Sequence, residues 1–181
     1  MRDLRAARSL PLVSASAALR ALAPATRYVL RGGSDVRAAA ESALGFGIPA
    51  TACRATVEGD RAALWLGPDE WLLIAPPPPP SGFGAALAEA LERLPHSLVD
   101  VSHRQSALAV SGPQATTLLA AGCPLDLDAS AFPVGMCTRT MLAKAEIVLW
   151  RTDPQAFRVE VWRSFVAYVS QFLGEAARGI I

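Results

Sequence analysis

The 181-residue sequence is short of the residues from which disulfides, metal sites and general bases are built. Its three cysteines, Cys53, Cys123 and Cys137, include no CxxC pair, so we expect neither a disulfide framework nor a zinc ribbon. Such sparse cysteine usage is typical of the reducing cytoplasm, where we expect the protein. The chain has two histidines, and no run approaches the about 18 apolar residues of a membrane-spanning helix. These absences argue against secreted disulfide-rich, zinc-ribbon and membrane-spanning classes.

Charge is scarce as well, and neither sign gathers on one part of the chain. Charged residues make up 18% of the sequence and apolar residues 52%, with a formal net charge of +1 and a mean hydropathy of +0.31. Because no basic run or tail stands out, we expect no nucleic-acid partner. The composition excludes a disordered chain, which needs low hydrophobicity and high charge. The high apolar fraction favours a surface that is covered by a protein partner.

Strand-like and helix-like segments alternate along the chain and predict a mixed α+β fold. The order of elements indicates two ferredoxin-like β-α-β-β lobes, at about 26–95 and 96–177, preceded by a poorly ordered or peripheral segment, 1–25. Five consecutive prolines, 76–80, predict an extended connector between a strand and a helix. The expected strands are 26–31, 52–57, 61–66, 70–75, 97–101, 105–110, 136–143, 145–150 and 156–161, and the expected helices are 36–44, 83–94, 113–121 and 165–177.

Two short motifs contain the residue types of known functional motifs but lack the structural context that those motifs require. Residues 45–50, GFGIPA, match a GxGxxA dinucleotide fingerprint, which requires a preceding strand and a following helix. Here a helix precedes the motif and Pro49 breaks the segment after it, so we interpret Gly45 as a helix end. Residues 100–104, DVSHR, contain the residue types of a hydrolase triad, but neighbours on a strand point to alternate faces. We expect a polar cluster that orders a turn.

The remaining candidates are isolated. Cys123, Cys137 and His103 follow no metal-ligand spacing, so no metal site is predicted. Asp126 and Asp128 are the only close acidic pair in the irregular segment 122–135, and we interpret them as part of a solvated loop. From the residues alone, we predict no catalytic and no cofactor-binding residue in this chain.

Three segments carry a resemblance to a known family: LWLGPDEWLL at 64–73, the stretch 98–140 with GCPLDL and TRT, and FRVEVWRSFVAYV at 157–169. Together they resemble the gamma subunit of heterotetrameric sarcosine oxidase, over roughly residues 26–177. The stretch DVSHRQSALAVSGPQATTLL is in turn similar to the folate-binding aminomethyltransferases typified by the glycine-cleavage T-protein. The resemblance implies one aminomethyltransferase-like domain over 26–177.

The resemblance also implies a division of labour. The partners are the alpha, beta and delta subunits, of which the alpha and beta subunits hold FAD, FMN, NAD and tetrahydrofolate, while this chain holds no cofactor. The complex oxidatively demethylates sarcosine to glycine, yielding H2O2 and formaldehyde or 5,10-methylenetetrahydrofolate. The gamma chain is then a non-catalytic assembly subunit, in keeping with its high apolar fraction and low charge.

An alternative function from another class stays open. As a free-standing folate-binding protein or one-carbon aminomethyltransferase, the chain would use Asp126 or Asp128 to orient the reacting amine. Arg104, Arg139 and Arg163 would bind the glutamate carboxylates of the folate tail, which suit arginine forks.

Overall fold

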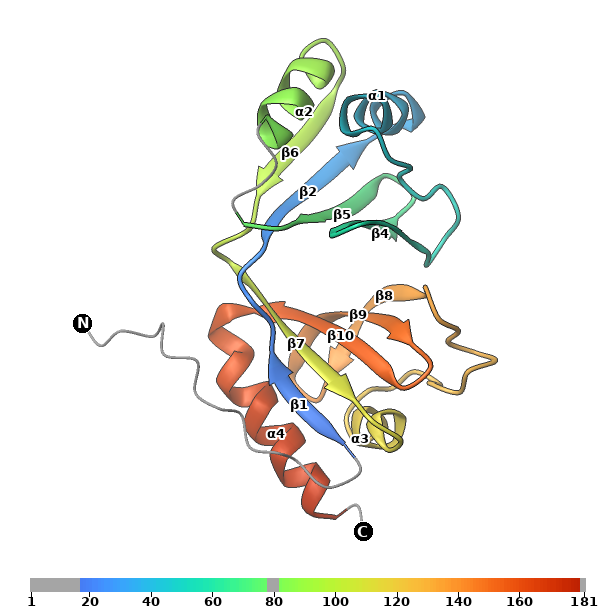
Figure 1. The fold of residues 1–181 in the computed structure, drawn as a ribbon, viewed down its shortest axis with the longest axis vertical. Helices are drawn as coiled ribbons and strands as arrows, with labels where there is room; N and C mark the ends of the chain where they lie inside the picture. The colour runs from blue at the N-terminus through green and yellow to red at the C-terminus, as the bar shows by residue number, and fades with distance from the viewer. Residues whose placement is uncertain (1–16, 78–81, 180–181) are drawn as a thin grey trace, which may run out of the picture. The chain divides into compact units, whose positions relative to one another are not determined.

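The computed structural model describes residues 17–77 and 82–179 and contains two five-stranded antiparallel sheets with helices (Figure 1), which confirms the predicted α+β class. The chain forms two compact units. The first unit consists of Pro24–Ser106 and Gly135–Arg139, and the second consists of the residues up to Ala23, Ala107–Val134 and the residues from Thr140 onward. The change from one unit to the other falls inside a strand, after Ser106.

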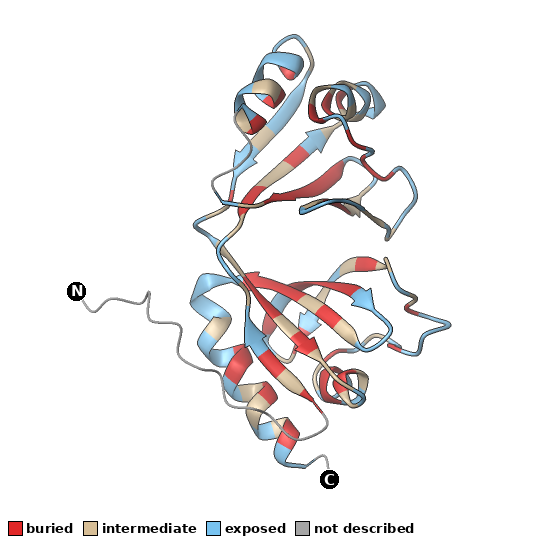
Figure 2. Ribbon diagram, viewed as in Figure 1, coloured by how far each residue is buried: buried red, intermediate tan, exposed pale blue. Residues whose placement is uncertain are grey.

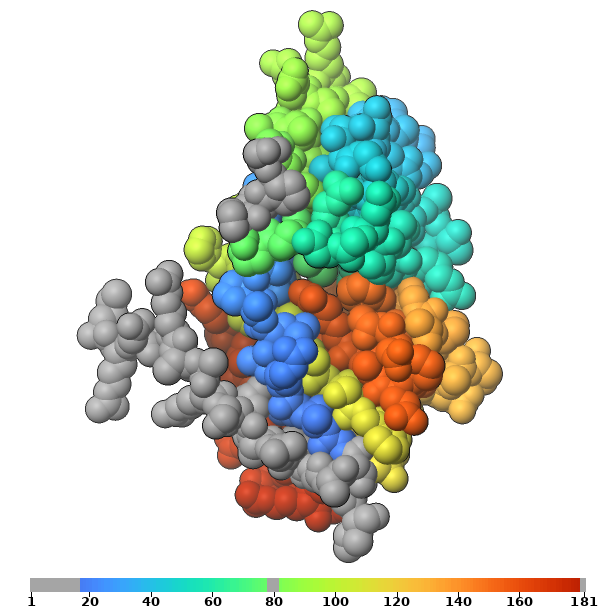
Figure 3. Space-filling model, viewed as in Figure 1, coloured from blue at the N-terminus to red at the C-terminus, as the bar shows by residue number. Residues whose placement is uncertain are grey.

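The first unit has the ferredoxin-like arrangement that the sequence predicts. Its sheet order is β3-β4-β5-β2-β6, in which β2-α1-β4-β5-α2-β6 is the ferredoxin-like succession and β3 lengthens the edge. Helices α1 and α2 contact each other, as the space-filling view also shows (Figure 3). The elements are β2 Thr26–Gly32, α1 Ser34–Leu44, β3 Ala55–Glu58, β4 Arg61–Gly67, β5 Glu70–Ala75, α2 Phe83–Leu91 and β6 His96–Asp100.

The core of the first unit lies between this sheet and its two helices. Val36, Ala40 and Leu44 recur every fourth residue of α1 and are buried against β2 and β5 residues such as Leu30 and Leu73. Gly45 ends α1 with a left-handed φ of 68°, where a side chain would be strained. The GFGIPA motif is therefore a helix end, as the sequence indicates. Figure 2 shows the buried residues along the faces that these elements turn to one another.

The second unit repeats the topology of the first, although the sequence shows no repeat. Its sheet order β1-β7-β10-β9-β8 matches β6-β2-β5-β4-β3 strand for strand, and α3 and α4 correspond to α1 and α2. The place of β6, which closes the first unit, is taken by β1 from the start of the chain. The elements are β1 Ala18–Ala21, β7 Gln105–Ser111, α3 Ala115–Ala120, β8 Cys137–Leu142, β9 Ala145–Asp153, β10 Ala156–Trp162, the 3-10 turn η1 Arg163–Phe165 and α4 Val166–Arg178.

Strand β1 lies in the segment 1–25, where the sequence predicts no strand. It pairs antiparallel with β7, with Leu19 opposite Val110, and buries Leu19 to 4% exposure. Four residues with one large apolar side chain carry too little pattern to indicate a strand. The strand forms because its backbone hydrogen-bonds to the edge of β7, a pairing that the local sequence does not indicate.

Other predicted elements agree with the structure to within a few residues. The C-terminal helix α4 begins one residue after the predicted start at Phe165, which is the last residue of η1, and α3 is shorter than the predicted 113–121. Of the five prolines, Pro78–Pro80 lie outside the described residues, so the predicted extended connector stays a prediction. Within the described ranges, no helix is long and apolar enough to cross a membrane.

Candidate functional site

The GPDEWLL segment forms the turn between β4 and β5 and the start of β5. Gly67 pairs with Glu70 across the turn, so Glu70 becomes the first residue of β5. Trp71, the next residue, points into the helix-covered core and its indole Nε1 donates to the Pro49 carbonyl at 2.8 Å. Because side chains alternate along a strand, Glu70 points away from the helices. The pairing of β2 with β5 places Arg31 directly opposite Glu70.

A second segment, far away in the sequence, reaches the same place. Residues 135–139 run antiparallel to 53–55: the Ala55 amide donates to Gly135 O at 2.9 Å and the Cys137 amide to Cys53 O at 3.0 Å. This pairing carries Arg139 to Glu70. The guanidinium donates from Nη1 to Oε2 at 2.8 Å and from Nη2 to Oε1 at 2.5 Å. The two family-like motifs, GPDEWLL and TRT, thus meet in one bidentate ion pair.

Glu70 is a buried carboxylate that arginines keep ionised. Its side chain is 11% exposed. The hydrogen bonds from Arg139 hold the pKa of Glu70 below its usual range, against the opposing effect of burial, and the charges of Arg139, Arg31 and Arg104 lower it further. Arg31 lies more loosely, with Nε 3.8 Å from Oε2 of Glu70. An ionised carboxylate bound on both oxygens is a structural acceptor and is poorly suited to take a proton from a substrate.

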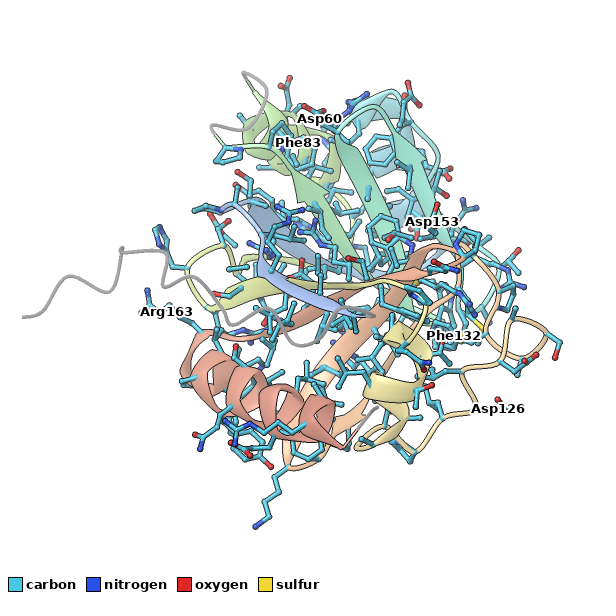
Figure 4. All side chains as sticks on the ribbon, turned by 60° about the horizontal axis from the view of Figure 1, so that its bottom comes forward. Asp60, Phe83, Asp126, Phe132, Asp153 and Arg163 are labelled. Atoms are coloured by element: carbon cyan, nitrogen blue, oxygen red, sulfur yellow. The ribbon has the colours of Figure 1, made fainter. Side chains whose placement is uncertain are left out.

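The structure brings together two of the three arginines that the folate alternative requires. Arg139 binds Glu70 through its fork, and Arg104, in the turn after β6, is close enough to influence the same carboxylate. Arg163 belongs to the second unit, where it opens η1 and is exposed. In Figure 4, Arg163 and Asp126 lie at opposite ends of that unit.

Asp126 and Asp128 are exposed and engaged within their own loop between α3 and β8. Asp126 Oδ1 accepts from the Asp128 amide at 2.9 Å. Asp128 Oδ1 accepts from the Ser130 amide at 2.8 Å and from the Ser130 hydroxyl at 2.6 Å. The hydrogen bond from the Ser130 hydroxyl is the main reason that the pKa of Asp128 is lowered. Both carboxylates shape local turns, the solvated-loop role that the sequence predicts.

Comparison with known proteins identifies the family. Residues 31–178 match the family model described as "Sarcosine oxidase, gamma subunit family". The chain belongs to the sarcosine oxidase gamma subunit family. It is 41% identical over 145 residues to the sarcosine oxidase subunit gamma of an Arthrobacter species, which covers 78% of this chain and 70% of the relative. It is 38% identical over 162 residues to that of Corynebacterium sp. strain P-1, covering 87% of this chain and 78% of the relative.

Solved structures support the assignment to the gamma-subunit family and show that a more distant protein has a similar fold. A chain of heterotetrameric sarcosine oxidase from Corynebacterium sp. U-96, solved in complex with pyrrole 2-carboxylate, matches with a TM-score of 0.84 at 34% identity, covering 90% of this chain and 84% of that one. Aminomethyltransferase T of the glycine cleavage system from Bartonella henselae matches with a TM-score of 0.66 at 13% identity, covering 92% and 48%. The second match shows the fold alone and confirms the aminomethyltransferase-like architecture.

One important residue of this gamma-family chain is missed by the sequence analysis. Arg151 on β9 is 5% exposed, and its guanidinium donates to three carbonyls: those of Leu127 at 3.2 Å, Phe132 at 2.9 Å and Pro154 at 2.6 Å. It also lies over the Phe157 ring at 5.0 Å. Arg151 therefore fixes the loop that carries Asp126 and Asp128. An arginine directly after the apolar run IVLW is the available signal, since a buried charge needs partners.

The other predicted candidates have structural roles. Ser102 and Asp100 order the turn after β6: the Ser102 amide donates to Asp100 Oδ1 at 2.8 Å, and the Arg27 amide donates to Ser102 Oγ at 2.9 Å. The DVSHR segment is thus the turn-ordering cluster that we expect. Burial raises the pKa of the Cys137 thiol to about 12, so it is protonated at neutral pH. In the described part of the chain, no three His, Cys, Asp or Glu residues gather as metal ligands.

Proposed function

We propose that this chain is the gamma subunit of a heterotetrameric sarcosine oxidase and that it is a non-catalytic assembly subunit. Its partners are the alpha, beta and delta subunits, of which the alpha and beta subunits hold FAD, FMN, NAD and tetrahydrofolate. The complex oxidatively demethylates sarcosine to glycine, with H2O2 and formaldehyde or 5,10-methylenetetrahydrofolate as the further products.

The observation that carries this proposal is the match of 90% of the chain, at a TM-score of 0.84 and 34% identity, to a chain of such a heterotetramer. The chemistry of the described residues supports the assembly role. Arg139 binds both oxygens of the Glu70 carboxylate, and Arg151 donates hydrogen bonds to backbone carbonyls. These groups stabilise the fold and are not arranged as a nucleophile with a base.

The folate alternative receives less support from the same geometry. The fork of Arg139 already binds a carboxylate of this chain, and the carboxylate of Asp128 accepts two hydrogen bonds from Ser130. The likeness to aminomethyltransferase T is at 13% identity and supports a shared architecture only.

The proposal is tested by co-expressing the full chain with its three candidate partners and purifying through a tag on the largest partner. We expect four unlike chains in one yellow complex with flavin absorbance and sarcosine-dependent peroxide formation. A parallel preparation without this chain measures what it contributes to assembly. A colourless chain that never co-purifies, yet binds tetrahydrofolate and loses that binding in Arg139→Ala, would instead establish the alternative.

A further inference from the structure

We propose that Cys53 and Cys137 are a redox-sensitive thiol pair, which a peroxide converts to a disulfide. Both cysteines are free thiols in the structure and both belong to the first unit. The disulfide would tie the segment 53–55 covalently to the segment 135–139, the one that carries Arg139. The pair does not depend on the proposed function, which would only supply the peroxide.

The antiparallel pairing of these two segments places the cysteines directly opposite each other. Arg54 is bridged to Met136, so Cys53 and Cys137 form the next pair along the two segments. The Cys137 amide donates to the Cys53 carbonyl oxygen at 3.0 Å. Opposed residues that share such a hydrogen bond have Cα atoms about 5.5 Å apart. Disulfides join residues whose Cα atoms are about 4.4–6.8 Å apart, so the backbone already has a suitable spacing.

The two thiols also influence each other. Burial is the main cause of the raised pKa of Cys137, and the neighbouring Cys53 thiol acts in the same direction. Such an effect indicates that the two sulfur atoms are close, because charge interactions weaken with distance. The third cysteine is placed differently: Cys123 belongs to the second unit, where its Sγ lies 3.9 Å from Thr140 Oγ1. Cys123 is therefore a natural internal control.

Cys53 is the member of the pair that a dissolved oxidant reaches first. It is partly exposed, whereas Cys137 is buried. The backbone of Cys53 is left-handed, with a φ of 57°, and among the described residues Ala143 is the only other non-glycine residue with a positive φ. Glycine adopts this conformation without strain, so the backbone does not account for a cysteine at position 53.

The oxidation proceeds in two steps that balance. The Cys53 thiolate attacks one oxygen of hydrogen peroxide; the O–O bond breaks, the first water leaves, and a sulfenic acid forms. The Cys137 sulfur then attacks the Cys53 sulfur, the S–O bond breaks, and the second water leaves with the thiol proton of Cys137. Two thiols are oxidised to one disulfide and one peroxide is reduced to two waters. The second step is intramolecular, so Cys137 can take part although it is buried. A thiol reductant can reverse the reaction, since a partly exposed disulfide is open to exchange.

The test treats the full chain with hydrogen peroxide at neutral pH, then unfolds it, blocks the remaining thiols with N-ethylmaleimide and maps linked peptides by mass spectrometry without reduction. Trypsin releases Cys53 in the peptide 38–54 and the other two cysteines in the peptide 105–139. Further cleavage before Asp126 separates Cys137 from Cys123. The same mapping is applied to a chain that is oxidised after unfolding in urea.

Two single variants complete the design. Cys53→Ser removes the sulfur that reacts first, and Cys123→Ser is the matched control. Thermal denaturation of each variant checks its folding.

In the folded wild type, we expect Cys53 to be linked to Cys137 in preference to Cys123 by on the order of tenfold or more, because the first pair is held opposite. The preference should be largely lost in the urea-unfolded chain, in which both links close long loops. Dithiothreitol should reverse the link, Cys123→Ser should retain it, and Cys53→Ser should leave Cys137 a free thiol.

Three results would overturn the pair. They are a Cys53 that is unchanged or oxidised to the sulfinic acid without any link, equal links to Cys123 and Cys137 in the folded chain, and loss of the link in Cys123→Ser. Each of them would leave the proposed function standing, because that function is decided by co-purification with partner subunits. Conversely, a chain that never co-purifies but forms the link would refute the proposed function alone.

Discussion

Replacing Arg139 by alanine should destabilise the chain by about 2 kcal/mol. The change removes two charge-assisted hydrogen bonds from Glu70, whose side chain is 11% exposed. Breaking a fully buried pair costs about 3–5 kcal/mol and an exposed pair contributes about 0–1 kcal/mol. The Arg139 side chain is 39% exposed, so solvent replaces part of what is lost and the expected value lies between these limits. For a chain of this length, the melting temperature should fall by about 4–8 °C.

A double-mutant cycle isolates the pair. Glu70→Gln, Arg139→Ala and the double variant are compared with wild type by denaturant unfolding, and we expect a coupling energy on the order of 1–2 kcal/mol. A coupling energy within error of zero would refute the idea that this ion pair joins the two segments.

The same pair predicts a pH dependence with a defined sign. The pKa of Glu70 is lowered in the folded state, so its stabilisation is complete above the unfolded value of about 4.5 and is lost as pH falls through the folded value. Wild type should therefore lose more stability than Arg139→Ala below about pH 4.5. Other carboxylates titrate alike in both proteins, so the difference between them reports Glu70. Parallel curves for the two proteins would contradict the assignment.

Single residues carry three further predictions. Arg151→Met should cost about 3 kcal/mol, measured by denaturant unfolding, because three carbonyls lose a buried donor; an unchanged midpoint would contradict this. Gly84→Ala should cost about 1–3 kcal/mol, since its Cβ would clash with the Tyr28 hydroxyl, and adding Tyr28→Phe should restore part of the loss. With a thiol pKa of about 12, Cys137 should resist iodoacetamide at pH 8 until the chain unfolds; rapid labelling of the native chain, detected by mass spectrometry, would refute it.

The local sequence pattern predicts most helices and strands of this fold, because the residues that indicate each helix or strand lie within it or directly beside it. Helix α1 carries buried residues at helical spacing and a glycine at its end, and β4 and β5 flank a Gly-Pro-Asp turn. The α+β class follows from such elements alone. Strand β1 is different: its hydrogen-bond partner, β7, lies far along the chain, and nothing in ALRA indicates that pairing.

Some residues of the site could be predicted from the sequence, but their contacts could not. The family-like motifs draw attention to GPDEWLL and TRT, and the folate alternative draws attention to Arg139. That Arg139 binds Glu70 depends on the pairing of Arg54 with Met136, which places 135–139 beside the edge of the first sheet. A sequence gives no register between segments so far apart. The effect of Arg104 on Glu70 could not be predicted either, since only the fold brings the charge of Arg104 near this carboxylate.

Each of the two units takes a segment from the other half of the chain, so neither unit is one continuous piece of sequence. The second unit takes its edge strand β1 from the start of the chain, and the first unit takes residues 135–139 from the second half. Strands β7 and β8 each pass from one unit into the other. Cutting the chain between the predicted lobes would therefore leave β7 without β1 and Glu70 without Arg139. Because contacts of such long sequence separation form only after large loops close, we expect that neither half folds alone. We therefore expect a chain built in this way to fold as a whole.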